Sequence, residues 1–317
     1  MSDRIMKAST SGEAVSTQVA VGKVTAERER AKAISLRRRF LSWSMTGLIY
    51  LFLAVMTIFA LFPIYYVIQA SLAGGQNLYT TDLKLLPANP TFDNYTYALT
   101  QLPLLNWIAN SFFINAMTTI IGLAFSVSGA YALSRFRLAG RDITLNVLLA
   151  IQAFPGLLAL TAYYVILNKL GLLNTLIGLV VIYAAGSLVF VCWNMKGYFD
   201  TLPVELEQAA MIDGATPTQA FLRVTLPLAA PALAASALFI FIGGWNEYAL
   251  ANLVLNSNAS GSNLTFVLGL YTLQSDFRTP WGYFAATSVV VSVPLIILFL
   301  YAQRFFRSGL TIGSVKG

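Results

Sequence analysis

Long uncharged stretches are the feature of this sequence that most restricts its fold. Charged residues make up 10% of the 317 residues and hydrophobic residues 57%. Because a typical soluble domain carries about a quarter of its residues as charges, this composition indicates a chain whose main solvent is a lipid bilayer. The intervals without Asp, Glu, Lys or Arg are 40–81, 94–134, 143–168, 170–195, 224–246, 248–275 and 279–303.

Six segments within these intervals are long enough to cross a membrane, since a helix needs about 20 apolar residues to span about 30 Å of hydrocarbon. The sequence therefore predicts an all-α integral membrane protein with six transmembrane helices. The interval 248–275 is not a seventh, because its polar stretch 256–263 leaves only the apolar run 264–273, which suits an interfacial or re-entrant helix. The predicted spans are 46–70, 108–132, 145–167, 175–193, 229–252 and 283–303.

The basic residues predict the orientation of these spans. Of the 20 Lys and Arg residues, only Lys84, Lys169 and Arg278 fall on one side of the arrangement. The positive-inside rule then places both termini in the cytoplasm. We expect a cytoplasmic, partly disordered N-terminal tail at 1–42, a transmembrane domain at 43–306 and a cytoplasmic C-terminal tail at 307–317. The basic tail flanks the first helix, which explains its charge without nucleic-acid binding.

The sequence lacks the residues that most catalytic and metal-binding sites require. The chain has no histidine, and Cys192 is its single cysteine, so His-dependent triads, disulfides within the chain and the common His and Cys metal sites are absent. No Gly-rich phosphate loop ending in Lys and Ser or Thr occurs, and no Gly-x-Ser-x-Gly elbow. We therefore expect no catalytic residue and no metal site.

The segment 200–227, between the fourth and fifth spans, contains the signals of two short helices. Thr201 is the predicted N-cap of the first, with Pro203 in its first turn and Gly214 at its end. Thr216 starts the second, followed by Pro217 and by Gln219 at the spacing of a capping box. The alternative interpretation is an ordinary loop, in which these capping residues only satisfy backbone hydrogen-bonding groups.

The residue pattern of this segment resembles the permease subunits of ABC importers. Their loop motif reads Glu-Ala-Ala, three residues, Gly, nine residues, Ile, one residue and Leu-Pro. The matching positions here are Gln208-Ala209-Ala210, Gly214, Val224 and Leu226-Pro227. Within this family the chain is most similar to the MalG-like permeases of maltose and maltodextrin importers, above all at residues 205–221, 281–306 and 309–317.

This resemblance implies an ABC type I importer permease fold, a location in the cell inner membrane as a multi-pass protein, and a function in ATP-driven sugar uptake. The implied partners are a second, MalF-like permease, two MalK-like ABC ATPases, an extracytoplasmic sugar-binding protein and membrane lipid. ATP and Mg²⁺ are then expected in the ATPase subunits, and no cofactor on this chain. The sequence leaves open which oligosaccharide is carried and whether this subunit touches it.

In this family the segment is a coupling helix that docks on an ATPase. The resemblance thus implies docking by Glu207, Gln208, Ala209, Ala210, Asp213 and Gly214. Gln208 departs from the family's usual Glu: an amide keeps hydrogen bonding but loses the charge that pairs with a basic group. Glu207 lies roughly 100° around the helix and does not replace it.

Outside this segment, a few residues carry functional hypotheses. Glu247 is the principal carboxylate within the predicted spans, and we expect it in the pathway, at an interface between permeases or in a structural role. Ser275, Asp276, Phe277 and Arg278 lie in the external loop that, by resemblance, contacts the binding protein.

Small residues on the second span predict close helix packing, and prolines in three spans predict bends. Two other functions compete with the importer permease, a proton-coupled secondary transporter and a membrane scaffold without transport activity. The lack of histidine and the single intramembrane carboxylate argue against the first of these. The small residues are Gly122, Ser126, Ser128, Gly129 and Ala132, and the prolines are Pro63, Pro155 and Pro294.

Overall fold

The computed structural model describes Trp43 and residues 45–74, 86–87, 89–255, 261–274 and 279–312. It divides into two units, Met1–Tyr66 and Val67–Gly317. Apart from Trp43, the described residues of the first unit belong to a helix that starts at Met45 and continues to Ser71 without a break at Pro63. This helix has 27 residues and a mean hydropathy of 2.4, so it spans about 40 Å, enough to cross a bilayer.

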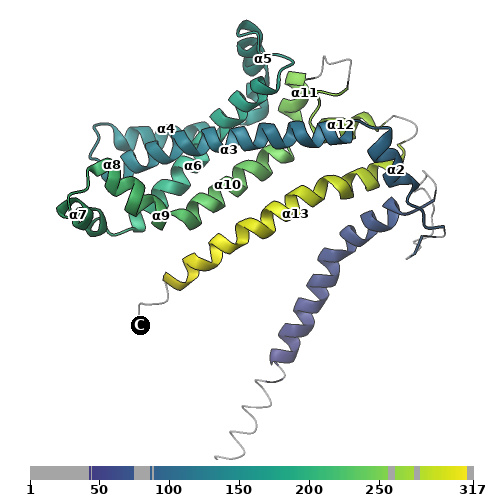
Figure 1. The fold of residues 1–317 in the computed structure, drawn as a ribbon, viewed down its shortest axis with the longest axis horizontal. Helices are drawn as coiled ribbons and strands as arrows, with labels where there is room; N and C mark the ends of the chain where they lie inside the picture. The colour runs from purple at the N-terminus through teal and green to yellow at the C-terminus, as the bar shows by residue number, and fades with distance from the viewer. Residues whose placement is uncertain are drawn as a thin grey trace, which may run out of the picture. The chain divides into compact units, whose positions relative to one another are not determined.

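The second unit is a helical bundle (Figure 1). Four long helices form it: α3 (Leu104–Arg135), α6 (Leu176–Thr201), α10 (Ala230–Trp245) and α13 (Trp281–Ile312). α10 packs against the other three, and α3 runs along α6. The described residues contain no β-strand beyond one isolated bridge, between Ala73 and Pro90. The predicted all-α architecture is thus confirmed.

Small residues of α3 allow its close approach to α6, as the sequence predicts. Gly122 is buried, and a Cβ built on it would lie 2.6 Å from the Ser187 hydroxyl of α6. The hydroxyl of Ser126 donates a hydrogen bond to the Leu188 carbonyl across the same interface, at 3.3 Å. Such contacts hold helices together where lipid supplies no hydrophobic driving force between them.

The third predicted span, 145–167, is not one continuous helix. It is divided into α4 (Arg141–Ala153), a single 3₁₀ turn (Gly156–Ala159) and α5 (Leu160–Lys169). Phe154 is extended, with ψ 128°, as expected for a residue before proline, and Pro155 cannot continue the hydrogen-bond ladder. Pro294, by contrast, lies inside the continuous α13.

The fifth predicted span, 229–252, also differs from the structure. α10 ends at Trp245, and a short helix, α11 (Ala249–Leu255), follows after a turn. At the other end α10 bends by 73° from the helical stretch Pro217–Leu228. Four described helices are long and apolar enough to span a membrane, or five if this bent pair is one span. Six spans and cytoplasmic termini therefore stay predictions.

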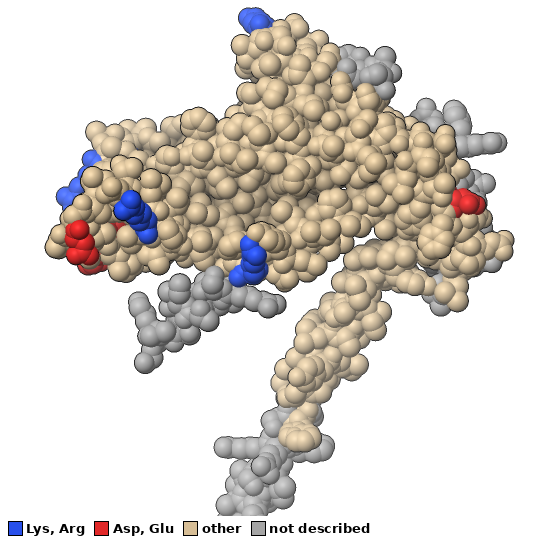
Figure 2. Space-filling view, in the orientation of Figure 1, with Lys and Arg blue, Asp and Glu red and all other residues tan. Residues whose placement is uncertain are grey.

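Two short helices pack at the end of the bundle opposite α7 and α8 (Figure 1). α12 (Phe266–Thr272) occupies the apolar run that is too short to span, as predicted. α2 (Asp93–Thr100) has no counterpart in the sequence prediction. Charged side chains gather at the end of this unit that carries α7, and the rest of the face in view is uncharged except for a few single charged side chains (Figure 2).

A buried apolar cluster supports the end of the bundle where α7 and α8 lie. It joins α3, α4 and α6 to the start of α10, and each of its largest members is almost completely inaccessible. Phe221 and Leu226, which follow α8, pack against it. The segment after α6 is therefore attached to the bundle by its own core. Representative members are Ala130, Leu133, Val191, Met195 and Phe199.

The contact between α12 and α3 gives a direct test of this packing. A Cβ on Gly269 would lie 2.3 Å from the indole of Trp107, whose Nε1 donates to the Gly261 carbonyl at 2.7 Å. Gly269→Ala should thus lower the free energy of unfolding by about 1–3 kcal/mol, measured as a lower midpoint of thermal unfolding in detergent. Gly197→Ala on α6, where a Cβ meets nothing within 4 Å, is the matched control and should be neutral or stabilising. Equal midpoints would contradict this packing.

Candidate functional site

The candidate site is a pair of short helices between α6 and α10. The first, α7, covers Glu205–Ile212, and the second, α8, covers Pro217–Ala220. The predicted N-cap role of Thr201 is wrong: Thr201 is the last residue of α6, and its hydroxyl donates to the Tyr198 carbonyl at 2.7 Å. α7 begins after Val204 without a side-chain cap, because α6 continues further than the sequence signals indicate.

Gly214 ends α7, as predicted. Its φ of +93° lies in the left-handed region, which glycine adopts without the Cβ penalty of other residues. The Ala215 N–H donates to the Ala210 carbonyl at 3.0 Å, and the Gly214 N–H to the Met211 carbonyl at 3.1 Å. These two bonds are those of a Schellman motif, so the turn satisfies carbonyls that the helix end leaves open.

The capping box of α8 is confirmed. The Gln219 N–H donates to the Thr216 hydroxyl at 3.3 Å, and the Thr216 N–H donates to the Gln219 side-chain oxygen at 2.9 Å. Beyond α8 the chain forms one π-helical stretch, Phe221–Thr225, and then α9 (Leu226–Leu228), before it bends into α10. The geometry of the turn between α7 and α8 is therefore fixed from both sides.

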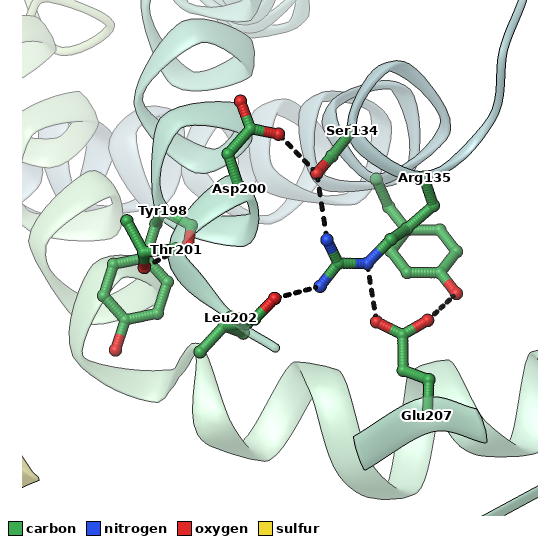
Figure 3. Close-up of polar contacts among 8 residues, drawn as sticks. Ser134, Arg135, Tyr198, Asp200, Thr201, Leu202 and Glu207 are labelled. Carbon is green, nitrogen blue, oxygen red and sulfur yellow. Dashed lines mark hydrogen bonds and ion pairs between the residues drawn. The ribbon is translucent and has the colours of Figure 1, made fainter. Parts of the chain in front are cut away.

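An ion pair connects α7 to the end of α3 (Figure 3). Arg135 Nε donates to one carboxylate oxygen of Glu207 at 2.7 Å, and the Tyr131 hydroxyl donates to the other at 2.7 Å. Arg135 also donates from a terminal nitrogen to the Leu202 carbonyl, at 3.1 Å. Both charged side chains are only 8% exposed. A single guanidinium thus holds α7 and the linker that precedes it.

The surroundings favour the ionised form of Glu207. Burial raises the cost of its charge, but the hydrogen bonds from Tyr131 and Arg135 outweigh that cost and lower the pKa of Glu207 below its usual range. A second pair lies beside it: Lys196 bonds Asp200 at 2.5 Å, and Ser134 donates to Asp200 at 2.6 Å. Charged and hydroxyl groups of α3, α6 and α7 therefore form one polar layer at this end of the bundle.

The six residues expected to dock on an ATPase do not share one face. Glu207 points into the chain, and both of its oxygens are engaged there, which differs from the expectation that it contacts an ATPase. The other five lie on the outside: four are exposed and Ala210 is partly buried. Ile212, the last residue of α7, is 86% exposed. The five are Gln208, Ala209, Ala210, Asp213 and Gly214.

Glu247 lies in the turn after α10, where it organises the next helix. Its carboxylate accepts hydrogen bonds from the Leu250 and Ala251 N–H groups, at 2.9 and 3.0 Å, and from the Tyr183 hydroxyl, at 2.7 Å. It therefore caps α11 and ties α6 to it. The predicted binding-protein contacts, Ser275 to Arg278, lie outside the described residues.

Tyr131 and Arg135 are the site residues that the sequence argument misses. In the sequence, Arg135 is only one of the basic residues from which the orientation of the helices is predicted. A signal is nevertheless present, because the two residues are one helical turn apart and point from the same face at the end of a long apolar helix. Their partner, Glu207, lies 72 residues beyond Arg135, and that pairing depends on the fold.

The sequence matches the family described as "Binding-protein-dependent transport system inner membrane component" over residues 19–311. The chain belongs to this family. It is 37% identical to the maltose/maltodextrin transport system permease protein MalG of Vibrio vulnificus over 276 residues, which cover 81% of this chain and 91% of that protein. It is 34% identical over 272 residues to the galactooligosaccharides transport system permease protein GanQ of Bacillus subtilis, covering 84% and 94%.

Among solved structures, a bacterial ABC transporter involved in the import of the acidic polysaccharide alginate matches with a TM-score of 0.71. The identity is 26%, and the match covers 83% of this chain and 96% of that one. This inner membrane component is thus the permease of an ABC importer, with the type I fold that the sequence predicts, and ATP hydrolysis takes place in separate subunits. Family membership gives no support to a proton-coupled transporter or a scaffold.

The Arg135–Glu207 pair should stabilise the permease. Removing one partner of a buried pair leaves the other uncompensated, at a cost of about 3–5 kcal/mol. Glu207→Gln should therefore lower the midpoint of thermal unfolding and speed hydrogen exchange of the α7 amides. Glu205→Gln, an exposed acid on the same helix, is the control and should change neither. A Glu207→Gln variant as stable as Glu205→Gln would refute the role of the pair.

The pair should also make stability depend on pH. Because the pKa of Glu207 is lowered in the folded chain, its contribution is complete above the usual Glu value of about 4.3 and is lost as the pH falls through the lower folded value. The stability difference between wild type and Glu207→Gln should thus be constant near neutral pH and shrink below about pH 4. A difference that grew on acidification would contradict the assignment.

Proposed function

We propose that this permease is the MalG-like subunit of an importer for maltose, maltodextrins or a related oligosaccharide. The names of its relatives support an oligosaccharide as substrate. Two relatives are named as permeases for maltose/maltodextrin and for galactooligosaccharides, and the solved structure belongs to an importer of the polysaccharide alginate. Its partners are then a MalF-like second permease, two MalK-like ATPases that bind ATP and Mg²⁺, and an extracytoplasmic sugar-binding protein. Six spans with both termini in the cytoplasm complete the proposal.

The exposed side of α7 is the proposed docking surface for one ATPase. Gln208, Ala209, Ala210, Asp213 and Gly214 form it together with Ile212. A large apolar side chain that is 86% exposed, at the end of a helix held by its own turn, has the character of an interface anchor. Gln208 offers hydrogen bonds to the ATPase but no charge. Glu207 belongs to the inner side of α7, where it fixes the helix.

The contacts beneath α7 suggest how ATPase movement reaches the membrane. When ATP binding closes the ATPases, a force on the docking surface acts on α7, and the Arg135–Glu207 pair carries it to α3. α3 packs along α6 and α10, so displacement of its end reorients the bundle as a unit. The observation that carries this proposal is the opposite orientation of the Glu207 and Ile212 side chains on one short helix.

The remaining predicted residues take supporting roles in this proposal. Glu247 holds the turn after α10 and lines a cavity beside it. Ser275, Asp276, Phe277 and Arg278 contact the sugar-binding protein on the external side.

Ile212→Glu tests the docking surface. The exposed side chain makes little contribution to the fold, so the variant should be as stable as wild type, while a charge in an apolar interface should weaken ATPase binding at least tenfold. The measurement is the amount of ATPase that co-purifies with the tagged permease, together with ATP-dependent uptake of radiolabelled maltose into proteoliposomes. Thr218→Glu, at an exposed position of α8, is the control. Wild-type levels of ATPase bound to Ile212→Glu would exclude this surface.

A further inference from the structure

A narrow apolar groove of about 200 Å³ lies between α10 and α13, which pack side by side (Figure 1). Ala234 and Ala237 of α10 and Ala302 of α13 line it, and their small side chains leave the space unfilled. Thr119 of α3 also lines it, but its hydroxyl donates to the Asn115 carbonyl of its own helix at 2.7 Å. Because cavities with apolar walls stay free of water, the groove suits a hydrocarbon group.

The dimensions of the groove match one hydrocarbon chain. Along α13 its lining runs from Leu298 to Phe305, which is about 10 Å at a rise of about 1.5 Å per residue. A volume of about 200 Å³ spread over that length is roughly 4–5 Å across, close to the separation of about 4 Å at which hydrocarbon groups pack. An α-helix with its side chains is about 10–12 Å wide and does not enter such a space. A single acyl chain is therefore the apolar group that fits.

A cationic side chain lies beside the groove. The Arg304 guanidinium is 3.6 Å from the centre of the Tyr301 ring and 4.8 Å from that of Phe305, and both rings line the groove. Such cation–π contacts hold an arginine in position. Among the described residues, none forms an ion pair or a hydrogen bond with Arg304, which is exposed. Its N–H donors, whose planar arrangement matches the oxygens of a phosphate, are thus available to a ligand.

The position of Arg304 along its helix corresponds to the level of lipid headgroups. The apolar span of α13 runs from Trp281 to Phe305, with a mean hydropathy of 2.3, and Arg304 lies in its last turn. Basic side chains near the ends of such spans extend to the membrane surface, and aromatic side chains gather at the same level. Leu298, nearly two turns earlier, lies deeper in the hydrocarbon. The groove therefore runs from the headgroup region toward the centre of the bilayer.

We propose that this groove binds an anionic phospholipid, with one acyl chain between α10 and α13 and the phosphate bonded to Arg304. Charge selects the class of lipid. The headgroup of phosphatidylglycerol keeps its net negative charge, whereas the choline of phosphatidylcholine neutralises the charge of its phosphate. The inference does not depend on which sugar the importer carries. A segment of the second permease is the competing occupant, and the width of the groove argues against it.

Arg304→Gln tests the headgroup contact, because it removes the charge and leaves the apolar groove intact. Native mass spectrometry of the purified transporter complex, with added phosphatidylglycerol or phosphatidylcholine of the same acyl chains, measures the affinity for each lipid. Wild type should bind phosphatidylglycerol about fivefold more tightly, the contribution of one arginine near a membrane surface. The variant should bind both lipids alike. Equal affinities of variant and wild type for phosphatidylglycerol would overturn the proposal.

Ala237→Phe tests the acyl-chain contact by filling the groove. It should weaken the binding of both lipids at least about fivefold, because the chain loses the burial of several methylene groups, and the midpoint of thermal unfolding should not fall. Unchanged lipid binding by this variant would exclude the groove as a lipid site. Loss of the second permease from the purified complex, with lipid binding retained, would assign the groove to that subunit instead.

Arg137→Gln is the matched control. Arg137 is an exposed arginine in the loop between α3 and α4, on the side of the membrane predicted for Arg304, and it does not line the groove. The change removes the same charge at a distance, so the affinity for phosphatidylglycerol should stay within about twofold of wild type. Glycerol phosphate, which has the phosphate without acyl chains, should not displace the lipid at equal concentration. Displacement would reduce the site to a phosphate contact and refute the role of the groove.

Discussion

The buried pair between Arg135 and Glu207 is the interaction on which the rest of the site depends. α7 has eight residues, too few for a stable helix in water by itself. It keeps its place because its one buried carboxylate is bonded to the end of α3, while the Schellman turn and the capping box fix its exit. With the inner side engaged in this way, the apolar and polar groups on the outer side are presented at a defined position.

Charged residues are rare within the described bundle. The described charged groups of the long helices lie near their ends, and those of the polar layer are paired with each other. Within the bundle, polar contacts come mostly from hydroxyl and amide groups, such as Ser126 on α3 and Tyr183 on α6, which bond across helices. In a membrane such groups fix orientation at a much lower desolvation cost than charges do. Glu247 is the exception, and three hydrogen bonds compensate it.

Sequence reasoning predicts well those features that local chemistry determines. The capping box at Thr216 and Gln219, the left-handed glycine at 214 and the short helix 266–272 all follow from neighbouring residues. The helix breaks at Pro155 and after Trp245 are harder to predict. An apolar run indicates that a segment lies in lipid, but it does not indicate that the segment is one continuous helix. The partners of Glu207 lie about 70 residues away along the chain, and no local pattern contains them. Family resemblance suggests a docking role for the segment, and that role stays a proposal, but it gives no sign that Glu207 is buried against Arg135 and Tyr131.

Gly214 has a consequence that concerns handedness. A Cβ at this position would meet nothing within 4 Å, so space does not exclude larger residues. The constraint is the sign of φ, which an L-residue adopts only with strain, whereas a D-amino acid would fit both the backbone and the surrounding space. The turn therefore excludes L-residues at this position because of their chirality and not because of their size. This requirement comes from the backbone of the chain itself and does not depend on any partner of α7.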